Sequence, residues 1–366
     1  MSGVAFLDLK RGVAARRAAI DAAIGEVLDS GYYIGGPHCA AFEASFAQYC
    51  GAAHCVGVAN GLDALQLGLR ALGVGAGDEV IVSSNGYIAT WLAVSAIGAV
   101  PVPVEPDPAT HNLDPGRVAA AITARTRVIL PTHVYGQPAD LDPLLSLAAN
   151  HGLKLLEDAA QAHGARYHGR RVGGHGDLVA WSFYPSKNLG ALGDGGAVTT
   201  NDGEIAARVR KLGNYGSDVR YVNPLKGVNS RLDPLQAAVL SVKLETLEAE
   251  NTRRQQIAAH YNAELADTPL ILPAAPNWAK PVWHIYAVRS PRRDALRDRL
   301  AAAAIGTLIH YPIPPHLQGA YAEMGLVAGS FPIAEQLARE VLSLPIDPHM
   351  SDDEVARVIA GVKHAA

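Results

Sequence analysis

The chain has 366 residues, of which 49% are hydrophobic and only 18% are charged, and its formal net charge is -4. Because an average soluble protein carries about 25% charged residues, this composition provides for a large apolar core and excludes an intrinsically disordered chain. The charge balance offers no basic surface for nucleic acid or for an anionic membrane. The length predicts one large domain with a smaller companion.

The amino-terminal segment, residues 1–12, carries charged side chains after only a few apolar positions, which is not the pattern of a secretory signal peptide. We therefore expect a cytoplasmic protein. The chain has three cysteines, Cys39, Cys50 and Cys55. Their odd number and the lack of C-x-x-C spacing argue against a disulfide framework and a zinc site, so we expect buried packing roles and no metal site.

Short apolar runs alternate with helical patterns along the first 200 residues, which is typical of a layered α/β domain. The runs predicted as strands are residues 55–59, 79–82, 100–105, 127–134, 153–158, 178–184 and 196–201. One apolar helical stripe lies between the first two runs and consists of Leu62, Leu65, Leu69 and Leu72. Another helix is predicted over 143–151, with Asp142 as its N-cap.

Residues 80–104 contain no charged side chain, and their number matches a membrane-spanning helix. The sequence SSNG at 83–86 and the prolines Pro101 and Pro103 would interrupt such a helix. We therefore predict a strand, a loop, a buried helix and a second strand in this run.

The pattern changes in the last third of the chain. Asp233 and Pro234 resemble an N-cap followed by a first-turn proline, which predicts a long helix running into the 250s. A strand is expected at 284–289, a helix at 294–304, and a last helix that begins with a capping box. We expect a large domain over residues 1–250 and a small α+β domain over residues 251–366.

Ligands of mostly parallel sheets bind beyond the carboxyl ends of the strands, so we expect functional residues directly after the predicted strands. Gly61 follows the first strand and begins a helix whose free N–H groups could hold a phosphate, although an ordinary capped helix fits equally. Tyr87 could lie against a planar ring or pack in the core. Glu157 and Asp158 end an apolar run, where a buried carboxylate needs a positive partner: a protonated ring nitrogen or a structural salt bridge.

Lys187 follows the strand at 178–184, in which Ser182 and Tyr184 share one face. Burial there would lower the pKa of the amine and make it available for covalent attachment of a carbonyl compound, whereas a lysine on a surface loop is the alternative. A phosphate-binding helix end, a stacking tyrosine, a buried carboxylate and this lysine together are the parts needed to hold pyridoxal 5'-phosphate.

Many short stretches, spread over nearly the whole chain, are similar to the DegT/DnrJ/StrS family of sugar aminotransferases. They are FLDLKR (6–11), SGYYIGGP (30–37), ANGLDALQLGLRALG (59–73), GDEVIV (77–82), YIATWLAV (87–94), YGQPADLDP (135–143), EDAAQAHGA (157–165), SFYPSKNLGALGDGGAV (182–198), NYGS (214–217), GVNSRLDPLQAA (227–238) and LIHYPIPPHLQ (308–318). The resemblance implies the fold of type I pyridoxal-phosphate aminotransferases, with a mostly parallel mixed sheet between helices.

The resemblance also implies a role for individual residues. Lys187 would attach the cofactor covalently and move protons during transamination. Asp158 would pair with the ring nitrogen, and Gln161 would hydrogen-bond the ring hydroxyl. Tyr87 would stack on the ring. The phosphate would be held by the N–H groups of Gly61 and Leu62, the Ser182 hydroxyl, and Asn229 from a second subunit of a homodimer with shared active sites.

The resemblance implies transfer of an amino group from L-glutamate to a keto-sugar nucleotide. Relatives that dehydrate sugars have histidine where Lys187 stands. YIATWLAV, PVPVEPD (101–107) and LIHYPIPPHLQ are similar to the subgroup that converts dTDP-3-keto-6-deoxyhexoses to 3-amino-3,6-dideoxy sugars. In that subgroup Tyr184, His310 and Tyr311 would contact the hexose; the last two could instead pack the small domain. The alternatives are a 4-keto sugar nucleotide aminotransferase and a catalytically silent binding or regulatory relative.

The chain departs from the family pattern at a few positions. Threonine is usual where Gly86 stands and common where Leu62 and Ser186 stand, which leaves the phosphate cradle and the adjacent loop less defined. His175 lies where a less polar residue is expected, and the sequence offers no physical reason for it.

Overall fold

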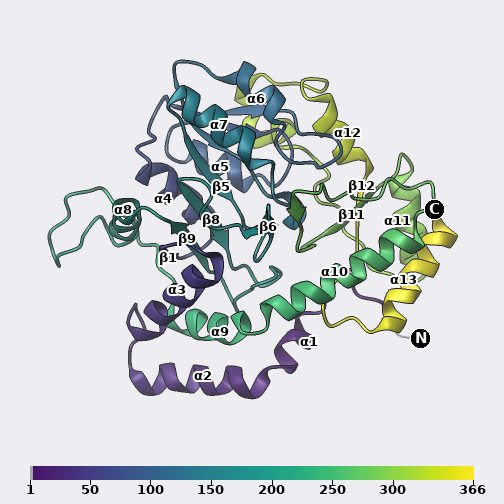
Figure 1. Cartoon of the computed structure of the whole chain (residues 1–366), viewed down its shortest axis with the longest axis horizontal. Coiled ribbons are helices and arrows are strands. Elements are labelled where there is room, and N and C mark those ends of the chain that lie inside the picture. Colours follow the sequence, from purple (N-terminus) through teal and green to yellow (C-terminus); the bar gives the residue numbers. More distant parts are fainter. Residues whose placement is uncertain (1–2) are drawn as a thin grey trace.

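A seven-stranded mixed sheet forms the centre of the computed structural model, which describes residues 3–366 (Figure 1). The strands in spatial order are β1 (His54–Val58), β9 (Gly196–Thr200), β8 (Leu178–Ser182), β5 (Lys154–Asp158), β4 (Thr126–Leu130), β2 (Glu79–Ser83) and β3 (Val100–Val104). Only β9 is antiparallel to its neighbours, β1 and β8. The predicted α/β class with a mostly parallel mixed sheet is confirmed.

Helices cover both faces of this sheet. On one face lie α4 (Gly61–Ala71), α5 (Ala89–Ser95) and α8 (Gly203–Gly213); on the other lie α3 (Pro37–Cys50), α6 (Pro115–Ala121) and α7 (Leu141–His151). Successive strand residues alternate between the two apolar layers: Val80 and Val82 pack with α4 and α5, whereas Ile81 packs with α6 and α7. This sandwich explains the long apolar runs in the sequence.

The amino-terminal helices α1 (Leu9–Ala14) and α2 (Arg17–Ser30) lie outside this sandwich. In Figure 1, α2 runs along α9 (Pro234–Leu244), and α10 (Leu247–Glu264) leads from there to a second group of elements. That group has β11 (Tyr286–Arg289) paired antiparallel with β12 (Val341–Leu344), and the helices α11 (Arg293–Ala302), α12 (Pro332–Glu340) and α13 (Asp352–Ala365). Short elements complete the chain: β6 (Arg166–Tyr167), β7 (Arg170–Arg171), β10 (Ala279–Lys280), and 3-10 turns at Val134–Gly136, Pro315–Leu317 and Gly319–Met324.

The second group has its own apolar core, formed by residues of α10, α11, α13, β11 and β12 together with Val4. The expected boundary between residues 250 and 251 falls inside α10, which is one uninterrupted helix. A division into two domains at that point stays a prediction.

Two helix predictions were wrong in detail. The helix expected at 143–151 begins at Leu141 and its N-cap is Asp140, because the N–H of Asp142 already lies in the first turn and donates to the Tyr167 hydroxyl. The long helix expected from residue 234 is broken between Leu244 and Leu247. At the break, the hydroxyl of Thr246 accepts hydrogen bonds from Arg16, a residue of the distant amino-terminal segment.

Other predicted elements are confirmed with small shifts at their ends. The strand expected at 127–134 ends at Leu130, the one expected at 178–184 ends at Ser182, and the helix expected at 294–304 is Arg293–Ala302. The last helix has the predicted capping box between Ser351 and Glu354. All three cysteines are buried and free.

The charge-free run 80–104 folds as predicted into β2, a loop, the buried helix α5 and β3. Within residues 3–366 no helix is long and apolar enough to cross a membrane.

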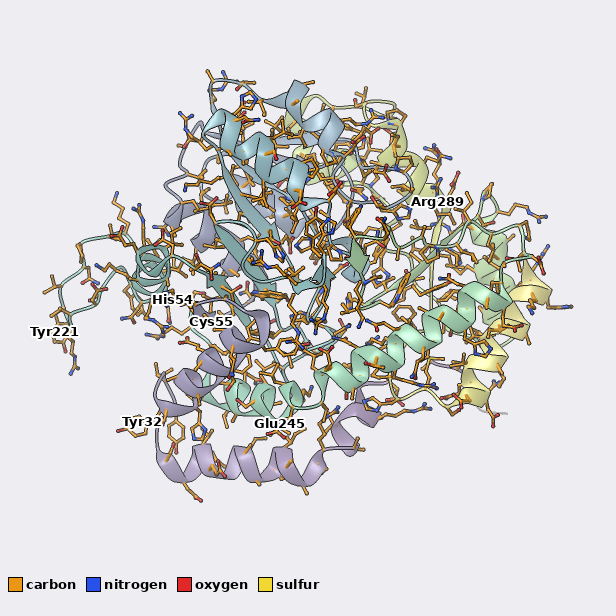
Figure 2. All side chains as sticks on the ribbon, viewed as in Figure 1. Tyr32, His54, Cys55, Tyr221, Glu245 and Arg289 are labelled. Carbon is orange, nitrogen blue, oxygen red and sulfur yellow. The ribbon has the colours of Figure 1, made fainter. Side chains whose placement is uncertain are left out.

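A loop between α8 and α9 projects from the body at the left of Figures 1 and 2. Tyr221 lies at its tip and is 85% exposed, and Val219 and Val222 beside it are also exposed. Within the described residues the Tyr221 ring has Arg220 over one face at 4.9 Å, and the loop still exposes three large apolar side chains to solvent.

Candidate active site

The carboxyl edge of the parallel strands opens into a cavity of about 400 Å³. Nearly every predicted site residue lines it: Gly61, Leu62, Tyr87, Asp158, Gln161, Ser182, Tyr184, Lys187, His310 and Tyr311. These residues come from both the large sheet and the second group of elements. Asn229 is the exception, because it is exposed and forms a bridge with Asn214 outside this cavity.

The amino terminus of α4 forms one wall of the cavity. Asn60 caps this helix, and its side chain accepts the N–H of Asp63 at 2.9 Å. Within the described residues the N–H groups of Gly61 and Leu62 have no acceptor, and the helix dipole adds positive potential there. A Cβ on Gly61 would lie 2.6 Å from the Cβ of Ser182, so only glycine lets the helix end approach β8 this closely.

The adjacent carboxylates at the end of β5 have different environments. Glu157 is fully buried on the far face, where it accepts hydrogen bonds from the Gly176 N–H at 2.7 Å and contacts His133 Nε2 at 2.9 Å. Burial raises the pKa of Glu157, but these partners outweigh burial and hold it below its ordinary value. Asp158 points into the cavity. Its carboxylate accepts the Thr90 hydroxyl at 2.7 Å and the Ala160 N–H at 3.2 Å.

Lys187 reaches the cavity from the turn that follows β8, where its N–H bonds the Tyr184 carbonyl at 2.8 Å. Burial lowers the pKa of its amine to about 8, against the opposite effect of the Asp158 carboxylate. A larger fraction of the amine is therefore uncharged near neutral pH than in an ordinary lysine, which favours nucleophilic and proton-transfer chemistry.

Two aromatic residues of the cavity wall lie against each other. The rings of Tyr87 and Tyr311 have centroids 5.3 Å apart. The Gln161 amide holds two neighbours: its nitrogen donates to the Tyr311 hydroxyl at 3.1 Å, and its oxygen accepts the Tyr135 N–H at 2.6 Å. The second hydrogen of that amide nitrogen stays free for a ligand.

The three residues expected to contact the substrate differ in exposure: Tyr184 is exposed, whereas His310 and Tyr311 are partly buried. Tyr184 is 56% exposed. The His310 ring contacts the Ser343 hydroxyl at 2.8 Å, and its carbonyl accepts the hydroxyl of Tyr135. Burial and then the charge of Lys187 lower the pKa of His310 to about 4, so the ring is neutral at physiological pH. Both His310 and Tyr311 line the cavity, and His310 also contacts the second group of elements through Ser343 of β12.

Several further polar residues line the cavity that sequence reasoning did not select: Thr90, Thr132, Asp194 and His284. Asp194 stands in the glycine-rich stretch after Lys187, a signal that could have found it. Thr90 is a single hydroxyl on the buried helix α5, and His284 precedes β11, more than ninety positions from Lys187. Neither position has a local motif. Within residues 3–366 no cluster of three or more metal-ligating side chains is present.

The departures from the family pattern have structural reasons at two positions. Gly86 has a φ of +95°, a conformation in which a threonine would be strained. His175 lies edge-on to the Tyr167 ring, with centroids 5.8 Å apart, and its two ring nitrogens have no hydrogen-bond partner in the described chain. Burial lowers the pKa of His175, and the ring acts as a neutral packing group near Glu157.

A lysine and a buried carboxylate that face one cavity at the carboxyl edge of an α/β sheet define the class of site found in aminotransferases. The chain belongs to the DegT/DnrJ/EryC1/StrS aminotransferase family, which matches residues 15–363. It is a sugar aminotransferase.

Curated relatives match almost end to end. The chain is 57% identical over 364 residues, 99% of its length and 100% of the relative's, to the erythromycin biosynthesis sensory transduction protein EryC1 of Saccharopolyspora erythraea. It is 56% identical to the dTDP-3-amino-3,4,6-trideoxy-alpha-D-glucose transaminase of Streptomyces venezuelae, covering 99% and 96% of the two chains. It is 53% identical to the dTDP-3-amino-3,6-dideoxy-alpha-D-galactopyranose transaminase of Aneurinibacillus thermoaerophilus, covering 98% of each.

Solved structures confirm the fold of this enzyme class. DesV of S. venezuelae, in complex with a ketimine intermediate, superimposes with a TM-score of 0.98 at 55% identity, covering 100% of this chain and 98% of DesV. NtdA of Bacillus subtilis, with the bound cofactor PMP, has a TM-score of 0.92 at 31% identity, covering 100% of this chain and 85% of NtdA.

Proposed function

We propose that this sugar aminotransferase uses pyridoxal 5'-phosphate to move the amino group of L-glutamate to C3 of a dTDP-3-keto-6-deoxyhexose, giving a dTDP-3-amino-3,6-dideoxyhexose. The observation that carries the proposal is the placement of Lys187 and Asp158 in one cavity with the open amino terminus of α4. The names of the Streptomyces and Aneurinibacillus relatives, both dTDP-3-amino sugar transaminases, support the nucleotide and the carbon.

The residues of the cavity fit the cofactor. The N–H groups of Gly61 and Leu62 and the Ser182 hydroxyl suit a phosphate, and a Cβ at Gly61 would fill this cradle. We assign the ring nitrogen to Asp158, the ring hydroxyl to the free N–H of Gln161, and the ring face to Tyr87. When bound, the cofactor supplies an electron sink that labilises the hydrogen on the amine-bearing carbon.

The chain's own residues then control protons and position. The Lys187 amine, whose pKa burial lowers to about 8, accepts and returns the proton as general base and acid. The Thr90 hydroxyl and the Ala160 N–H fix the orientation of the Asp158 carboxylate. Tyr184, His310 and Tyr311 line the side of the cavity where we place the hexose, and the neutral His310 ring donates or accepts a hydrogen bond without adding charge.

We propose a homodimer with shared active sites, which two observations support. Asn229 lies outside the cavity of its own chain, and the loop that carries Val219, Tyr221 and Val222 exposes apolar side chains. We propose that this loop packs on a second copy and that Asn229 reaches the phosphate site there. The cytoplasmic location expected from the sequence stays a prediction.

Two alternatives are considered beside this proposal. Amination of a 4-keto sugar nucleotide requires the same cofactor residues, so these residues do not determine whether C3 or C4 of the sugar is aminated. A regulatory relative is suggested by the words "sensory transduction" in the name of the Saccharopolyspora protein. The desolvated Lys187 amine favours catalysis over this second alternative, because a silent binding protein needs no such group.

The experiment is incubation of the purified protein with glutamate and, separately, with 3-keto and 4-keto dTDP-sugars, followed by product identification. We expect amination of the 3-keto sugar. Amination of the 4-keto sugar alone would contradict the assignment of the carbon. No amination of either sugar by a protein that binds the cofactor would favour the regulatory alternative.

A further inference from the structure

A second cavity, of about 320 Å³, adjoins the first. The two share four lining residues, Ser186, His284, Ile285 and His310. The remaining wall of the second cavity is apolar except for one guanidinium, that of Arg254 on α10. The second cavity is thus a mostly apolar extension of the active site with a single cationic side chain, that of Arg254.

Arg254 is 5% exposed, yet it has few partners. Its Nη1 donates to the carbonyl of Ile346 at 2.7 Å, and within the described chain no acceptor is recorded for Nε or Nη2. Both nitrogens keep some accessible surface, because the fully buried side-chain atoms without a hydrogen-bond partner do not include them. Arg254 therefore offers free hydrogen-bond donors to this cavity.

No carboxylate neutralises this guanidinium directly. In the described part of the chain no Asp or Glu oxygen lies within 4.0 Å of it, and the nearby Asp347 instead accepts the His349 N–H at 2.7 Å. Burial lowers the pKa of Arg254 to about 10, with Asp347 acting in the opposite direction, so the side chain is charged at neutral pH. A buried cation without a direct anionic partner is costly unless a ligand supplies the anion.

Arg254 and Lys187 also line one cavity together, a small one of about 60 Å³. The His284 ring stands near both cations: burial, then the charge of Lys187, then that of Arg254, holds its pKa well below its ordinary value. A small molecule whose amine meets Lys187 could therefore place an anionic end at Arg254.

We propose that Arg254 binds a carboxylate of the amino donor in the half of the reaction that loads the amino group. A guanidinium is the side chain best matched to a carboxylate, through two parallel hydrogen bonds from its planar fork. The apolar walls formed by Phe6, Leu308 and Ile346 suit the methylene groups of a dicarboxylic amino acid. This inference rests on the proposed function and adds a donor subsite to it.

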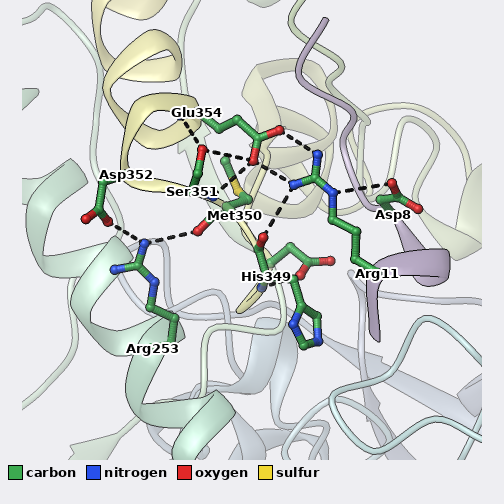
Figure 3. Close-up of polar contacts among 9 residues, drawn as sticks. Asp8, Arg11, Arg253, His349, Met350, Ser351, Asp352 and Glu354 are labelled. Atoms are coloured by element: carbon green, nitrogen blue, oxygen red, sulfur yellow. Dashed lines mark hydrogen bonds and ion pairs between the residues drawn. The ribbon is translucent and has the colours of Figure 1, made fainter. Parts of the chain in front are cut away.

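The test compares Arg254→Met and Arg254→Lys with a matched control, Arg253→Met. Arg253 is the next residue of α10, but its guanidinium points away and donates to Asp352 at 2.6 Å and to the Met350 carbonyl at 3.1 Å (Figure 3). It lies with the surface pair of Arg11 and Glu354 and lines neither cavity. Calorimetry on the cofactor-loaded enzyme measures binding of glutarate, a dicarboxylate with no amine to react, and of dTDP.

For Arg254→Met we expect the Kd of glutarate to rise about 100-fold and the kcat/KM for glutamate to fall by a similar factor, as for loss of a charged hydrogen-bonding partner. Arg254→Lys keeps the charge without the fork, and we expect a rise of about tenfold. Arg253→Met should change neither value by more than about twofold, and the Kd of dTDP should stay within about twofold in every variant.

An unchanged glutarate Kd in both folded Arg254 variants would overturn the inference. A weakened dTDP affinity with intact glutarate binding would also overturn it, because the guanidinium would then serve the nucleotide diphosphate. The proposed function fails separately: if glutarate binding depends on Arg254 but no keto sugar is aminated, the donor subsite stands and the acceptor assignment is wrong.

Discussion

The two adjoining cavities are built from the chain in different ways. The side of the first cavity assigned to the cofactor is made largely by short contiguous segments, 60–62, 158–161 and 182–187, each of which lies at the end of a strand of the large sheet. The second joins Phe6, Arg254 and Ile346, which come from the amino-terminal segment, α10 and the segment after β12. The functional residues at strand ends therefore stand in short sequence motifs. The residues of the second cavity are far apart in the sequence and form no such motif.

We expect the largest loss of activity from substitution of Lys187 in the first cavity. Lys187→Met removes the group that accepts and returns the proton, and we expect kcat to fall by about 10⁴-fold, at the upper end of the range for a general acid–base residue. Single-turnover kinetics with glutamate measures the loss. Lys154→Met, which removes an exposed lysine paired with Asp177, is the control and should leave kcat within about twofold. A similar loss in both variants would contradict the role of Lys187.

Asp158→Asn tests the opposite end of the same cavity. The neutral amide no longer compensates a protonated ring nitrogen, and we expect kcat to fall roughly 10²- to 10³-fold, as for removal of one partner of a buried charge pair. Thr90→Val keeps the carboxylate but removes its hydrogen bond of 2.7 Å, and should cost about tenfold. If Thr90→Val costs as much as Asp158→Asn, the carboxylate charge is not the deciding property.

Gly61→Ala tests the phosphate cradle without removing a polar group. Its Cβ would lie 2.6 Å from the Ser182 Cβ, so the end of α4 must move, and we expect the Kd of the cofactor to rise about tenfold. Gly25→Ala is the matched control, since nothing lies within 4 Å of its Cβ position in α2. Fluorescence titration of cofactor-free protein measures both. Equal affinities would show that the phosphate lies elsewhere.

A smaller effect concerns stability and pH. Burial lowers the pKa of Lys187 from 10.5 to about 8, so below pH 8 the folded, cofactor-free protein holds a buried charge that the unfolded chain accommodates more easily. Stability of the native sequence should therefore rise with pH between about 8 and 10.5. We expect cofactor-free Lys187→Met to have the higher Tm at pH 7 and to lose this advantage by pH 10. A constant difference in Tm across that range would contradict the desolvation of the amine.

The positions of the strands along the chain and the residues of the first cavity were within reach of the sequence because each depends on local patterns. Alternation of apolar residues predicts the strands, and Lys187, Asp158 and Gly61 each stand at a strand end. The break between α9 and α10 was missed because it depends on Arg16, a partner far away in the chain. Arg254 was missed for a related reason: on a helix with many charged residues, its burial is visible only once α10 packs on Ile346.

Gly86 shows a further limit of prediction from the sequence. The sequence records only that a threonine is absent, and the positive φ of the loop is what makes glycine the suitable residue. Asn229 is the opposite case. The resemblance placed it at the phosphate, while in a single chain it lies outside the cavity, so its assignment depends on a second copy.

The most direct test of the account is to reduce the cofactor-loaded protein with borohydride and map the labelled peptide by mass spectrometry. We predict one pyridoxyl label, on Lys187, in the segment that follows β8. A label on another lysine, such as the half-buried Lys243, or no label on a protein that retains the cofactor would contradict the central claim that Lys187 carries the chemistry of this site.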